Sequence, residues 1–455
     1  MKNFSEETTR YWNPIVERLP QEQLRTLQLR KFKKIFEWAY ERSKFHRRLY
    51  QEAGLEPGDI KTFEDIRRVP KVEKSMMRSI QRKDPFPYGE ALCVPLEEVV
   101  EFRQTSGTTG QPVYQPDTWQ DWEWWSESWA YILLAQGFRR TDRFFVPFGY
   151  NVFVAFWAAH YAAEKLGCEV VPGGVLDTAA RILKIQELQA TALMATPSYI
   201  LTMADTAKNR LKINPARDLT VRRIVCAGEP GASIPSTRKR MEEAWGAKVF
   251  DHVGATEIGA WGYECQEQSG IHINEALFLV EVEDLITGEP ITGPGQKGKM
   301  VITALDRLAQ PCIRFDSKDL VEWADSPCSC GRTFRLFKGG VSGRTDDITK
   351  VKGVLLSPTA IEEVVHSFKE LGDEYEVVVS KRGDTDEIAL VVEIPPGLEG
   401  KKQELSARLK DRLRLQTNLS YLIVFHPLHS LPRAEGKARR FKDTRDSKEG
   451  NGREG

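Results

Sequence analysis

The sequence has no excess of charge of either sign. Its 455 residues include 65 Lys and Arg and 65 Asp and Glu, so the formal net charge at pH 7 is zero. Proteins that bind nucleic acids or anionic membrane surfaces usually carry a basic excess. The balance therefore favours neither kind of partner. Hydrophobic and charged shares of 41% and 29% indicate a folded protein.

The sequence also has no uninterrupted apolar run long enough to span a membrane. Its richest apolar region, 146–163, is broken by polar residues and by Pro147 and Gly149. The N-terminal residues have no apolar core of the kind found in a secretion signal. We therefore expect a cytoplasmic protein. There the 7 cysteines stay reduced and act as core residues, metal ligands or nucleophiles rather than as disulfides.

The chain is too long for one ordinary core, so two domains of unequal size are expected. Apolar periodicity predicts a long amphipathic helix over 21–49. From residue 143 onward, strand-like and helix-like runs alternate, which is typical of parallel sheets covered by helices. The expected strands are 143–148, 169–171, 192–195, 222–227 and 248–253, and the expected helices are 153–166, 177–188, 199–207 and 234–245.

A glycine-rich stretch at 339–343 precedes a smaller unit, with expected helices over 358–368 and 404–413 and expected strands over 376–380 and 388–393. The sequence therefore predicts an α/β protein. Its large N-terminal domain, 1–343, contains helix-covered β-sheets. Its small, mobile C-terminal α/β domain covers 344–442. The charged and glycine-rich end, 443–455, is expected to be a disordered tail.

Three short segments carry residue types that suit a nucleotide. Thr105–Gly110 combines hydroxyl residues with glycines, which lets backbone N–H and side-chain O–H groups face an anion. Cys226–Pro230 and Gly254–Glu257 each follow an expected strand, where ligands of open α/β sheets bind. Glu257 offers the hard oxygen that Mg²⁺ prefers. Taken singly, the first segment is an ordinary polar turn, and the other two are as readily loops between strand and helix.

In their order along the chain, these segments resemble those of the adenylate-forming (acyl-activating) superfamily, and within it the phenylacetate–coenzyme A ligase family. The resemblance extends over nearly the full chain, from Tyr11-Trp12-Asn13-Pro14 through Thr196-Pro197-Ser198-Tyr199 to Glu435-Gly436-Lys437. It implies that ATP activates a carboxylic acid to an acyl-adenylate, with release of pyrophosphate. The acyl group is then transferred to coenzyme A, with release of AMP.

The resemblance also implies roles for single residues. Lys437, Glu257 and Thr256 are catalytic, and Glu257 binds Mg²⁺. Asp346 is the hinge between the domains, and Lys352 and Gly353 lie by the coenzyme A path. The ATP or AMP ligands are Thr105, Ser106, Gly107, Thr108, Thr109, Gly110, Gly228, Glu229, Pro230, Asp251, Thr256, Asp319 and Arg344.

The sequence departs from the family in its phosphate loop. The family usually has a lysine directly after the last glycine, or two positions further. This sequence has Gln111 and Val113 there. A cation near the phosphates is therefore missing unless Arg103 or another residue replaces it.

The expected acid pocket departs as well. Tyr150 and Phe153 are expected to form its walls, with Gly228 and Val253 nearby at strand ends. The segment 148–157 is bulkier than the glycine-rich version associated with phenylacetate. Its apolar and aromatic character suits an aryl or arylalkyl acid. Phe156 and Trp157 are interpreted as helix core instead.

Four further residues form a candidate zinc site: Cys265, His272, Cys328 and Cys330. Three thiolates and one imidazole satisfy tetrahedral Zn²⁺ without an open position, so the role would be structural. Because the Cys-x-Cys spacing is tight, four unrelated loop residues are the alternative. The same positions resemble a zinc site of some family members. The cysteines expected in the core are Cys93, Cys168, Cys226 and Cys312.

Two alternatives to a coenzyme A ligase stay open. One is an adenylating transferase with another acceptor. The other is a nucleotide-binding protein that has lost turnover, which Gln111 and Val113 favour slightly and the presence of Glu257, Asp319 and Lys437 opposes. For quaternary structure, the expected N-terminal helix and the aromatic run Trp122, Trp124 and Trp125, interpreted as exposed, offer a homodimer contact.

Overall fold

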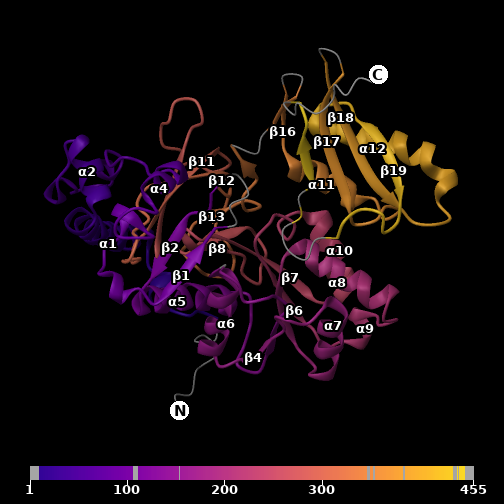
Figure 1. Ribbon diagram of the computed structural model, residues 1–455, viewed down its shortest axis with the longest axis horizontal. Coiled ribbons are helices and arrows are strands. Elements are labelled where there is room, and N and C mark those ends of the chain that lie inside the picture. Colours follow the sequence, from indigo (N-terminus) through magenta and orange to yellow (C-terminus); the bar gives the residue numbers. More distant parts are fainter. Residues whose placement is uncertain are drawn as a thin grey trace.

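The computed structural model shows a large lobe, formed by residues up to 345, beside a small lobe formed by residues from 349 onward (Figure 1). The structure describes residues 10–105, 111–152, 154–345, 349–351, 354–382, 385–433, 438 and 440–445. The prediction of an α/β protein with a smaller C-terminal unit is confirmed.

The large lobe is built on an eight-stranded sheet with the strand order β13-β9-β8-β7-β6-β5-β3-β4. Strands β3 to β7 run parallel, as expected from the alternation of strands and helices. Strands β8, β9 and β13, which were not predicted from the sequence, pair antiparallel. The connection from β7 to β8 holds only residues 256–258, which is too short for a parallel crossover. The bounds are β3 (Arg143–Val146), β4 (Glu169–Pro172), β5 (Ala192–Ala195), β6 (Arg223–Cys226), β7 (Lys248–Ala255), β8 (Gly259–Tyr263), β9 (Ile271–Ile273) and β13 (Leu336–Phe337).

Helices cover both faces of the parallel part of this sheet. Successive residues of β6 point to opposite faces, so Ile224 joins one apolar cluster and Val225 joins another. One face packs against α7 (Thr178–Glu187), α8 (Pro197–Asn209) and α10 (Pro235–Trp245), and the other against α5 (Trp119–Ala135) and α6 (Val154–Leu166). The short α9 (Pro215–Asp218) lies beside α8 and α10.

Helix α5 is more deeply buried than its sequence suggests. The exposed fractions of Trp122, Trp124 and Trp125 are 5%, 6% and 2%. The ring of Trp124 lies 5.4 Å from that of Phe278 in the second sheet, so α5 is enclosed between the two sheets. The interpretation of these tryptophans as exposed is therefore wrong, and they provide no surface for a homodimer.

The second sheet of the large lobe is antiparallel, with the order β10-β11-β12-β14. Its bounds are β10 (Phe278–Glu283), β11 (Lys297–Ala304), β12 (Phe315–Glu322) and β14 (Gly343–Arg344). Strand β14 spans the expected boundary between residues 343 and 344 of the two domains, where its pairing with β12 fixes Arg344 opposite Asp319.

The expected helix over 21–49 is not continuous. Ser43 has an extended backbone, and its hydroxyl accepts a hydrogen bond from the backbone N–H of His46, which starts a second helix. The N-terminal helices are α1 (Gln21–Arg42), α2 (Lys44–Glu52), α3 (Phe63–Ile66) and α4 (Lys74–Ile80).

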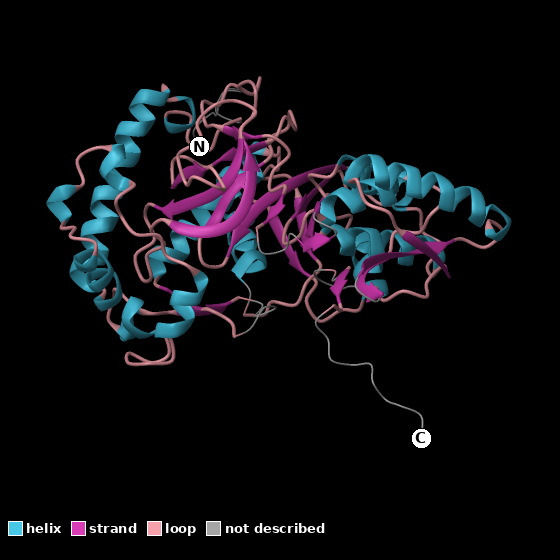
Figure 2. Cartoon of the chain, turned by 90° about the horizontal axis from the view of Figure 1, so that it is seen from above, coloured by secondary structure: helices cyan, strands magenta, loops and turns pink. Residues whose placement is uncertain are grey.

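The small lobe has its own apolar cluster, formed by residues from Val351 to Phe441. Its sheet has the order β19-β18-β17-β20, and Figure 2 shows it beside the helices of the lobe. Its elements are β15 (Thr349–Val351), β16 (Val354–Leu356), α11 (Pro358–Ser367), β17 (Tyr375–Arg382), β18 (Thr385–Ile394), α12 (Lys402–Thr417), β19 (Leu422–Pro427) and β20 (Phe441–Asp443). The tail predicted from 443 onward therefore begins too early. Asp443 pairs with β17, and Arg445 forms an ion pair with Asp386.

A hydrogen-bonded contact between α10 and α11 joins the lobes. Arg240 donates to the carbonyl oxygens of His366, at 2.8 Å, and Phe368, and to the Asp373 carboxylate. One turn earlier, the Thr237 hydroxyl donates to Glu362 at 3.0 Å. The guanidinium fork thus holds the start of the small lobe in one orientation against α10.

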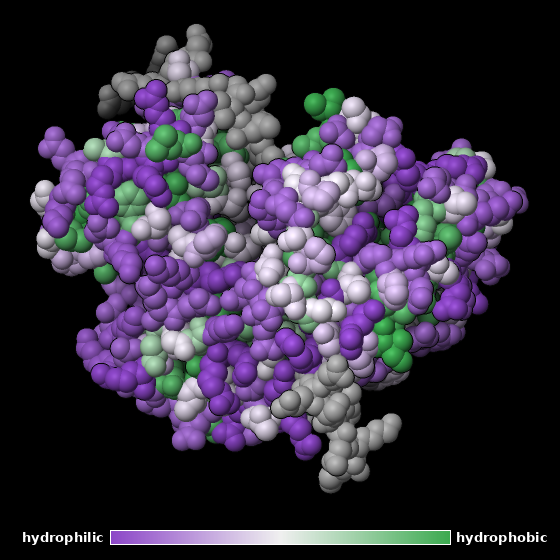
Figure 3. Space-filling model, turned by 180° about the vertical axis from the view of Figure 1, so that it is seen from behind, coloured by the Kyte–Doolittle hydropathy of each residue, from purple (hydrophilic) through white to green (hydrophobic). Residues whose placement is uncertain are grey.

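The surface in Figure 3 is mostly hydrophilic, and its hydrophobic residues form small separate patches. Among the helices that the structure describes, none has both the length and the apolar character needed to cross a bilayer.

Candidate active site

The described ends of the predicted phosphate loop lie in a short hairpin. Its strands, β1 (Glu101–Gln104) and β2 (Tyr114–Asp117), pair antiparallel, and the last pair joins Gln104 to Tyr114. Thr105 continues this pairing, because its backbone N–H donates to Val113 and its hydroxyl accepts from the Val113 N–H at 3.0 Å. Residues 106–110, which are the rest of the predicted loop, lie outside the described residues.

The two described residues that the sequence analysis considered for the missing phosphate-loop cation, at positions 113 and 103, are both buried. Val113 is fully buried in the apolar cluster that contains α5 and α6, which we call the main apolar cluster. Position 113 therefore points into the core. Arg103 is 5% exposed, lies about 5 Å from the Trp122 and Trp157 rings, and forms an ion pair with Glu101. Its guanidinium is thus engaged by the aromatic rings and is no substitute for the lysine.

Helix α4 supplies two cations that the sequence analysis missed. Lys74 Nζ lies 2.7 Å from Glu257 Oε1, and the Glu257 side chain is only 7% exposed. One turn later, Arg78 Nε donates to the carbonyl oxygen of Gln111 at 2.8 Å. A Lys and an Arg at positions i and i+4 of a short helix share one face, and this was the available sequence signal. One cation thus contacts the predicted Mg²⁺ ligand, and the other contacts the residue that follows the phosphate loop.

The segment Gly228–Pro230 follows β6, as predicted. Gly228 has a φ of 97°, which favours glycine at this position. One oxygen of Glu229 accepts from the backbone N–H of Ser198 at 2.8 Å and from its hydroxyl, and the other accepts from the N–H of Ala438 at 2.8 Å. The predicted adenine-contacting segment therefore contacts the residue that follows Lys437, although Lys437 itself lies outside the described residues.

Two further predicted nucleotide ligands are adjacent. Asp319 on β12 and Arg344 on β14 are paired in register, and Arg344 Nη1 lies 3.2 Å from Asp319 Oδ1. Asp251 lies on β7 and is buried. Burial, reinforced by the negative charge of Glu264, raises the pKa of the Asp251 carboxyl to about 8.

Tyr150, expected in the acid pocket, ends a hydrogen-bonded chain. Its hydroxyl lies 2.7 Å from His160 Nδ1, and His160 Nε2 lies 3.1 Å from Glu164. Both Tyr150 and Val253 are half-buried at the edge of the main apolar cluster. Phe156 stacks on Phe148 with ring centroids 4.1 Å apart, which agrees with its interpretation as core. The predicted residues Phe153, Asp346, Lys352 and Gly353 lie outside the described residues.

The four predicted metal ligands are brought together and buried. Their ligand atoms all lie within 4.8 Å of one another. Cys265 Sγ is 3.6 Å from Cys328 Sγ, too far for a disulfide, and Cys330 Sγ is 3.4 Å from His272 Nε2. A tetrahedral zinc ion bonded at about 2.3 Å would hold its sulfur ligands about 3.8 Å apart. The four residues therefore fit such an ion. The cysteines expected in the core are buried as well: Cys93, Cys168, Cys226 and Cys312.

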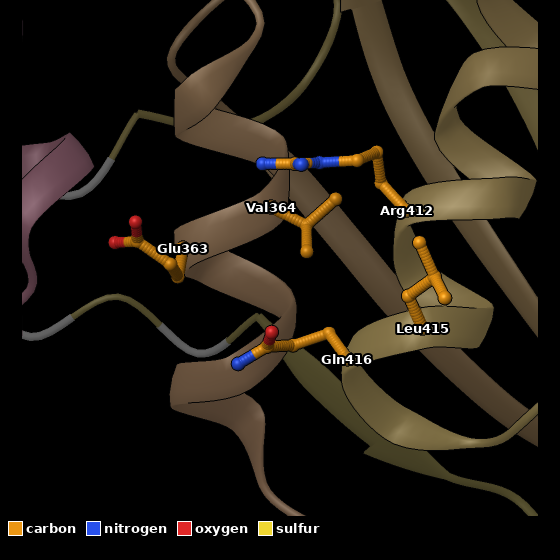
Figure 4. A pocket seen from close by; sticks show the side chains of 5 residues that line it. All are labelled: Glu363, Val364, Arg412, Leu415 and Gln416. Carbon is orange, nitrogen blue, oxygen red and sulfur yellow. The ribbon is translucent and has the colours of Figure 1, made fainter.

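Two surface pockets lie away from these residues. One of about 150 Å³ lies between α11 and α12 and is lined by Glu363, Val364, Arg412, Leu415 and Gln416 (Figure 4). The other, of about 300 Å³, lies at the junction of α10 and α11. Neither is lined by a predicted nucleotide, acid or metal ligand, so the candidate site remains at the strand ends.

The burial of position 113 generates a prediction. Restoring a lysine there, Val113→Lys, places an uncompensated charge in the core and should cost about 3 kcal/mol or more of unfolding free energy. Gln111→Lys, at an exposed position, is the matched control and should change it by less than about 0.5 kcal/mol. Denaturant unfolding measures both. Equal stability of the two variants would show that residue 113 does not point into the core.

The chain is similar in sequence to adenylate-forming ligases over nearly its full length. Residues 353–445 match the family model of the AMP-binding enzyme C-terminal domain. A phenylacetate-coenzyme A ligase of Thermus thermophilus is 34% identical over 458 residues, which cover 95% of this chain and 99% of that protein. A phenylacetate-coenzyme A ligase of Pseudomonas putida is 32% identical over 429 residues, which cover 93% and 94%.

Two crystal structures of a 2-hydroxyisobutyryl-CoA ligase are similar to different degrees. The ligase in the postadenylation state, in complex with R3-HIB-AMP, is 28% identical and has a TM-score of 0.91, with 97% of this chain and 94% of that chain covered. In the thioesterification state, with 2-HIB-AMP and CoA, the TM-score is 0.72, with 96% and 93% covered. The family, the fold class and the enzyme class predicted from the sequence are confirmed. The chain belongs to the phenylacetate–coenzyme A ligase family of adenylate-forming enzymes.

Proposed function

We propose that this protein activates an aryl or arylalkyl carboxylic acid with ATP and transfers the acyl group to coenzyme A. The observation that carries the proposal is the position of Glu229. It lies after β6, whose parallel neighbour β7 leads into the Thr256–Glu257 segment, and it binds the backbone next to Lys437. Residues for the nucleotide, for a divalent cation and for catalysis thus converge from both lobes.

The reaction explains why these residue types are needed. A carboxylate oxygen attacks the α-phosphorus of ATP, the bond to the β-phosphate breaks, and pyrophosphate leaves. A thiolate then attacks the acyl carbon, and AMP leaves with one former carboxylate oxygen. Because two anions meet in the first step, positive charge must be held nearby. When bound by Glu257, Mg²⁺ would supply part of that charge.

The chain's own cations supply the rest. We assign Lys437, which the sequence places in the small C-terminal domain, to the carboxylate and the α-phosphate. Lys74 already lies against Glu257, and Arg78 lies against the residue that follows the phosphate loop. These two side chains compensate for the lysine that Gln111 and Val113 replace.

The arrangement of the lobes supports an adenylation-type conformation. Similarity to the postadenylation state of the 2-hydroxyisobutyryl-CoA ligase is higher than to its thioesterification state, with TM-scores of 0.91 and 0.72 at nearly equal identity. We therefore propose that the small domain, 344–442, swings about Asp346 relative to 1–343 between the two steps. Lys437 would then leave the site, and Lys352 and Gly353 would reach the coenzyme A path.

The acid pocket lies at Tyr150, Phe153, Gly228 and Val253 in this proposal. An aromatic ring against Tyr150 and Val253 suits this half-buried, apolar edge. The cytoplasm provides ATP and coenzyme A and keeps the free cysteines reduced, so we place the protein there. Its proposed partners are these small molecules, without nucleic acid or membrane.

We further propose a structural zinc ion at Cys265, His272, Cys328 and Cys330. The support is their mutual burial and the spacing of their ligand atoms. Arg332 lies next to this cluster and forms a buried ion pair with Glu17, which ties the N-terminal segment to it. Zinc would therefore stabilise the joint between that segment and the main sheet.

Pyrophosphate exchange into ATP across a panel of aromatic and aliphatic acids tests the function directly. We expect exchange with at least one aryl or arylalkyl acid, and formation of its coenzyme A thioester. Exchange without a thioester would indicate a different acceptor. ATP binding without exchange on any acid would refute the enzyme.

Removal of the small-lobe cation should separate the two half-reactions. Lys437→Ala should slow adenylation by about 100-fold or more, because the charge that stabilises the transition state is lost. Thioester formation from a supplied acyl-adenylate should be largely spared. Lys442→Ala, an exposed lysine on β20, is the matched control. Equal losses in both half-reactions would contradict the domain swing.

Elemental analysis tests the metal. Protein purified without chelators should contain about one zinc per chain, and Cys328→Ser should lose the ion and unfold at a lower temperature. Cys312→Ser, which removes a buried thiol elsewhere, should keep it. Less than about half an equivalent of zinc in the unmodified protein would exclude the site.

A further inference from the structure

A fully buried arginine holds the segment that carries Thr256 and Glu257. Arg307, in the loop after β11, has no exposed surface. Its Nη1 donates to the backbone carbonyl oxygens of Thr256, at 2.8 Å, and Glu257, at 3.1 Å. Arg307 thus fixes the backbone of this segment, while the Glu257 carboxylate contacts Lys74.

The other side of the same guanidinium binds the phosphate-loop hairpin. Arg307 Nη2 donates to Asp117 Oδ1 at 3.0 Å, and Asp117 is the last residue of β2. Trp125 lies beside the pair, with its indole N–H donating to the same oxygen at 3.3 Å and its ring 5.3 Å from the guanidinium. One planar group therefore spans the distance between the strand after the phosphate loop and the Thr256–Glu257 segment.

The pair is poorly explained as a source of stability. Taking two charges out of water is costly, and apolar residues of similar volume are often as stabilising as a buried ion pair. Burial raises the pKa of Asp117 to about 6, although Arg307 opposes this shift. What a pair of apolar residues could not do is donate to two specified carbonyl groups. A lysine could not do so while also binding Asp117 in the same plane.

We propose that Arg307 and Asp117 are positioning residues for the nucleotide and its metal ion. They set the separation between the phosphate-loop hairpin and the Thr256–Glu257 segment, so that the Thr256 hydroxyl and the Glu257 carboxylate face the phosphates together. The inference rests on the proposed function, because it assigns these two side chains to an ATP site. It adds a bridge whose halves lie 190 positions apart in the sequence.

Variants of the pair test this role. Arg307→Lys keeps the charge but loses the fork, and the double variant Asp117→Leu with Arg307→Met replaces the pair by apolar side chains. The matched control is Arg314→Lys. Arg314 is also a buried arginine that donates to two backbone carbonyl groups and to carboxylates, but it contacts neither Thr256 nor Glu257.

Each protein is assayed for the Mg²⁺ concentration that half-saturates acid-dependent pyrophosphate exchange, for the KM of ATP and for melting temperature. Both Asp117/Arg307 variants should raise the half-saturating Mg²⁺ concentration by about 10- to 100-fold, the range typical of residues that orient metal ligands. The apolar variant should do so even where its melting temperature is unchanged. Arg314→Lys should lower the melting temperature without this shift.

The inference is overturned if both variants stay within about twofold of the unmodified protein in their Mg²⁺ requirement, or if Arg314→Lys shifts it equally. A failure of the proposed function looks different, because the unmodified protein would then show no exchange with any acid. In that case, calorimetric titration with Mg²⁺-ATP compares the same variants. Equal affinity of the variants and the unmodified protein would overturn the inference there too.

Discussion

The parallel pairing of β6 with β7 is the constraint on which the candidate site depends. Cys226 pairs with Asp251, so both strands end at the same edge of the sheet. Gly228–Pro230 follows β6 there, and β7 continues to Ala255 before Thr256–Glu257, so the two segments leave the sheet at the same edge. Three other elements contact these two segments. Lys74 of α4 contacts Glu257, the hairpin that flanks the phosphate loop is joined to Thr256–Glu257 through Arg307, and Ala438 of the small lobe contacts Glu229. The edge is where ligands of open α/β sheets generally bind.

Among the contacts that hold the small lobe against the large lobe, two differ in their distance from the predicted site. Arg240 of α10 binds backbone carbonyl groups at the C-terminal end of α11, and none of its acceptors is a predicted site residue. Glu229 binds the backbone beside Lys437, within the predicted site. A swing of the small lobe has to break both.

The sequence predicts those parts of the fold that depend on local pattern. Alternating apolar runs place β3 to β7 and their helices within a few residues, because each run is bounded by turn residues. The break at Ser43 escapes such reasoning, since the helical period continues through it and only the capping hydroxyl marks the new start. The burial of Trp122, Trp124 and Trp125 could not be predicted from the local pattern either. Their burial comes from a second sheet packed on α5, which no local pattern of that helix indicates.

For the candidate site too, local motifs could be predicted from the sequence, whereas contacts made by tertiary packing could not. Motif order predicts roles for Glu229, Glu257, Asp319 and Arg344, and the structure pairs the last two directly. Lys74, Asp117 and Arg307 could not be found in that way. Each acts through a partner far away in the sequence, and a buried charge is recognisable only once the segments around it are packed. The cations that we propose in place of the family's lysine likewise contact the site from a helix distant in the sequence.

The most direct test of adenylation at this site follows a carboxylate oxygen of the acid into the products. An acid that supports turnover is labelled with a heavy oxygen isotope in its carboxylate, and the products formed with ATP and coenzyme A are analysed by mass spectrometry. The account predicts that one labelled oxygen is transferred to AMP, because the carboxylate attacks the α-phosphorus and AMP leaves from the acyl carbon. Label in inorganic phosphate, with ADP as the nucleotide product, would contradict adenylation at this site.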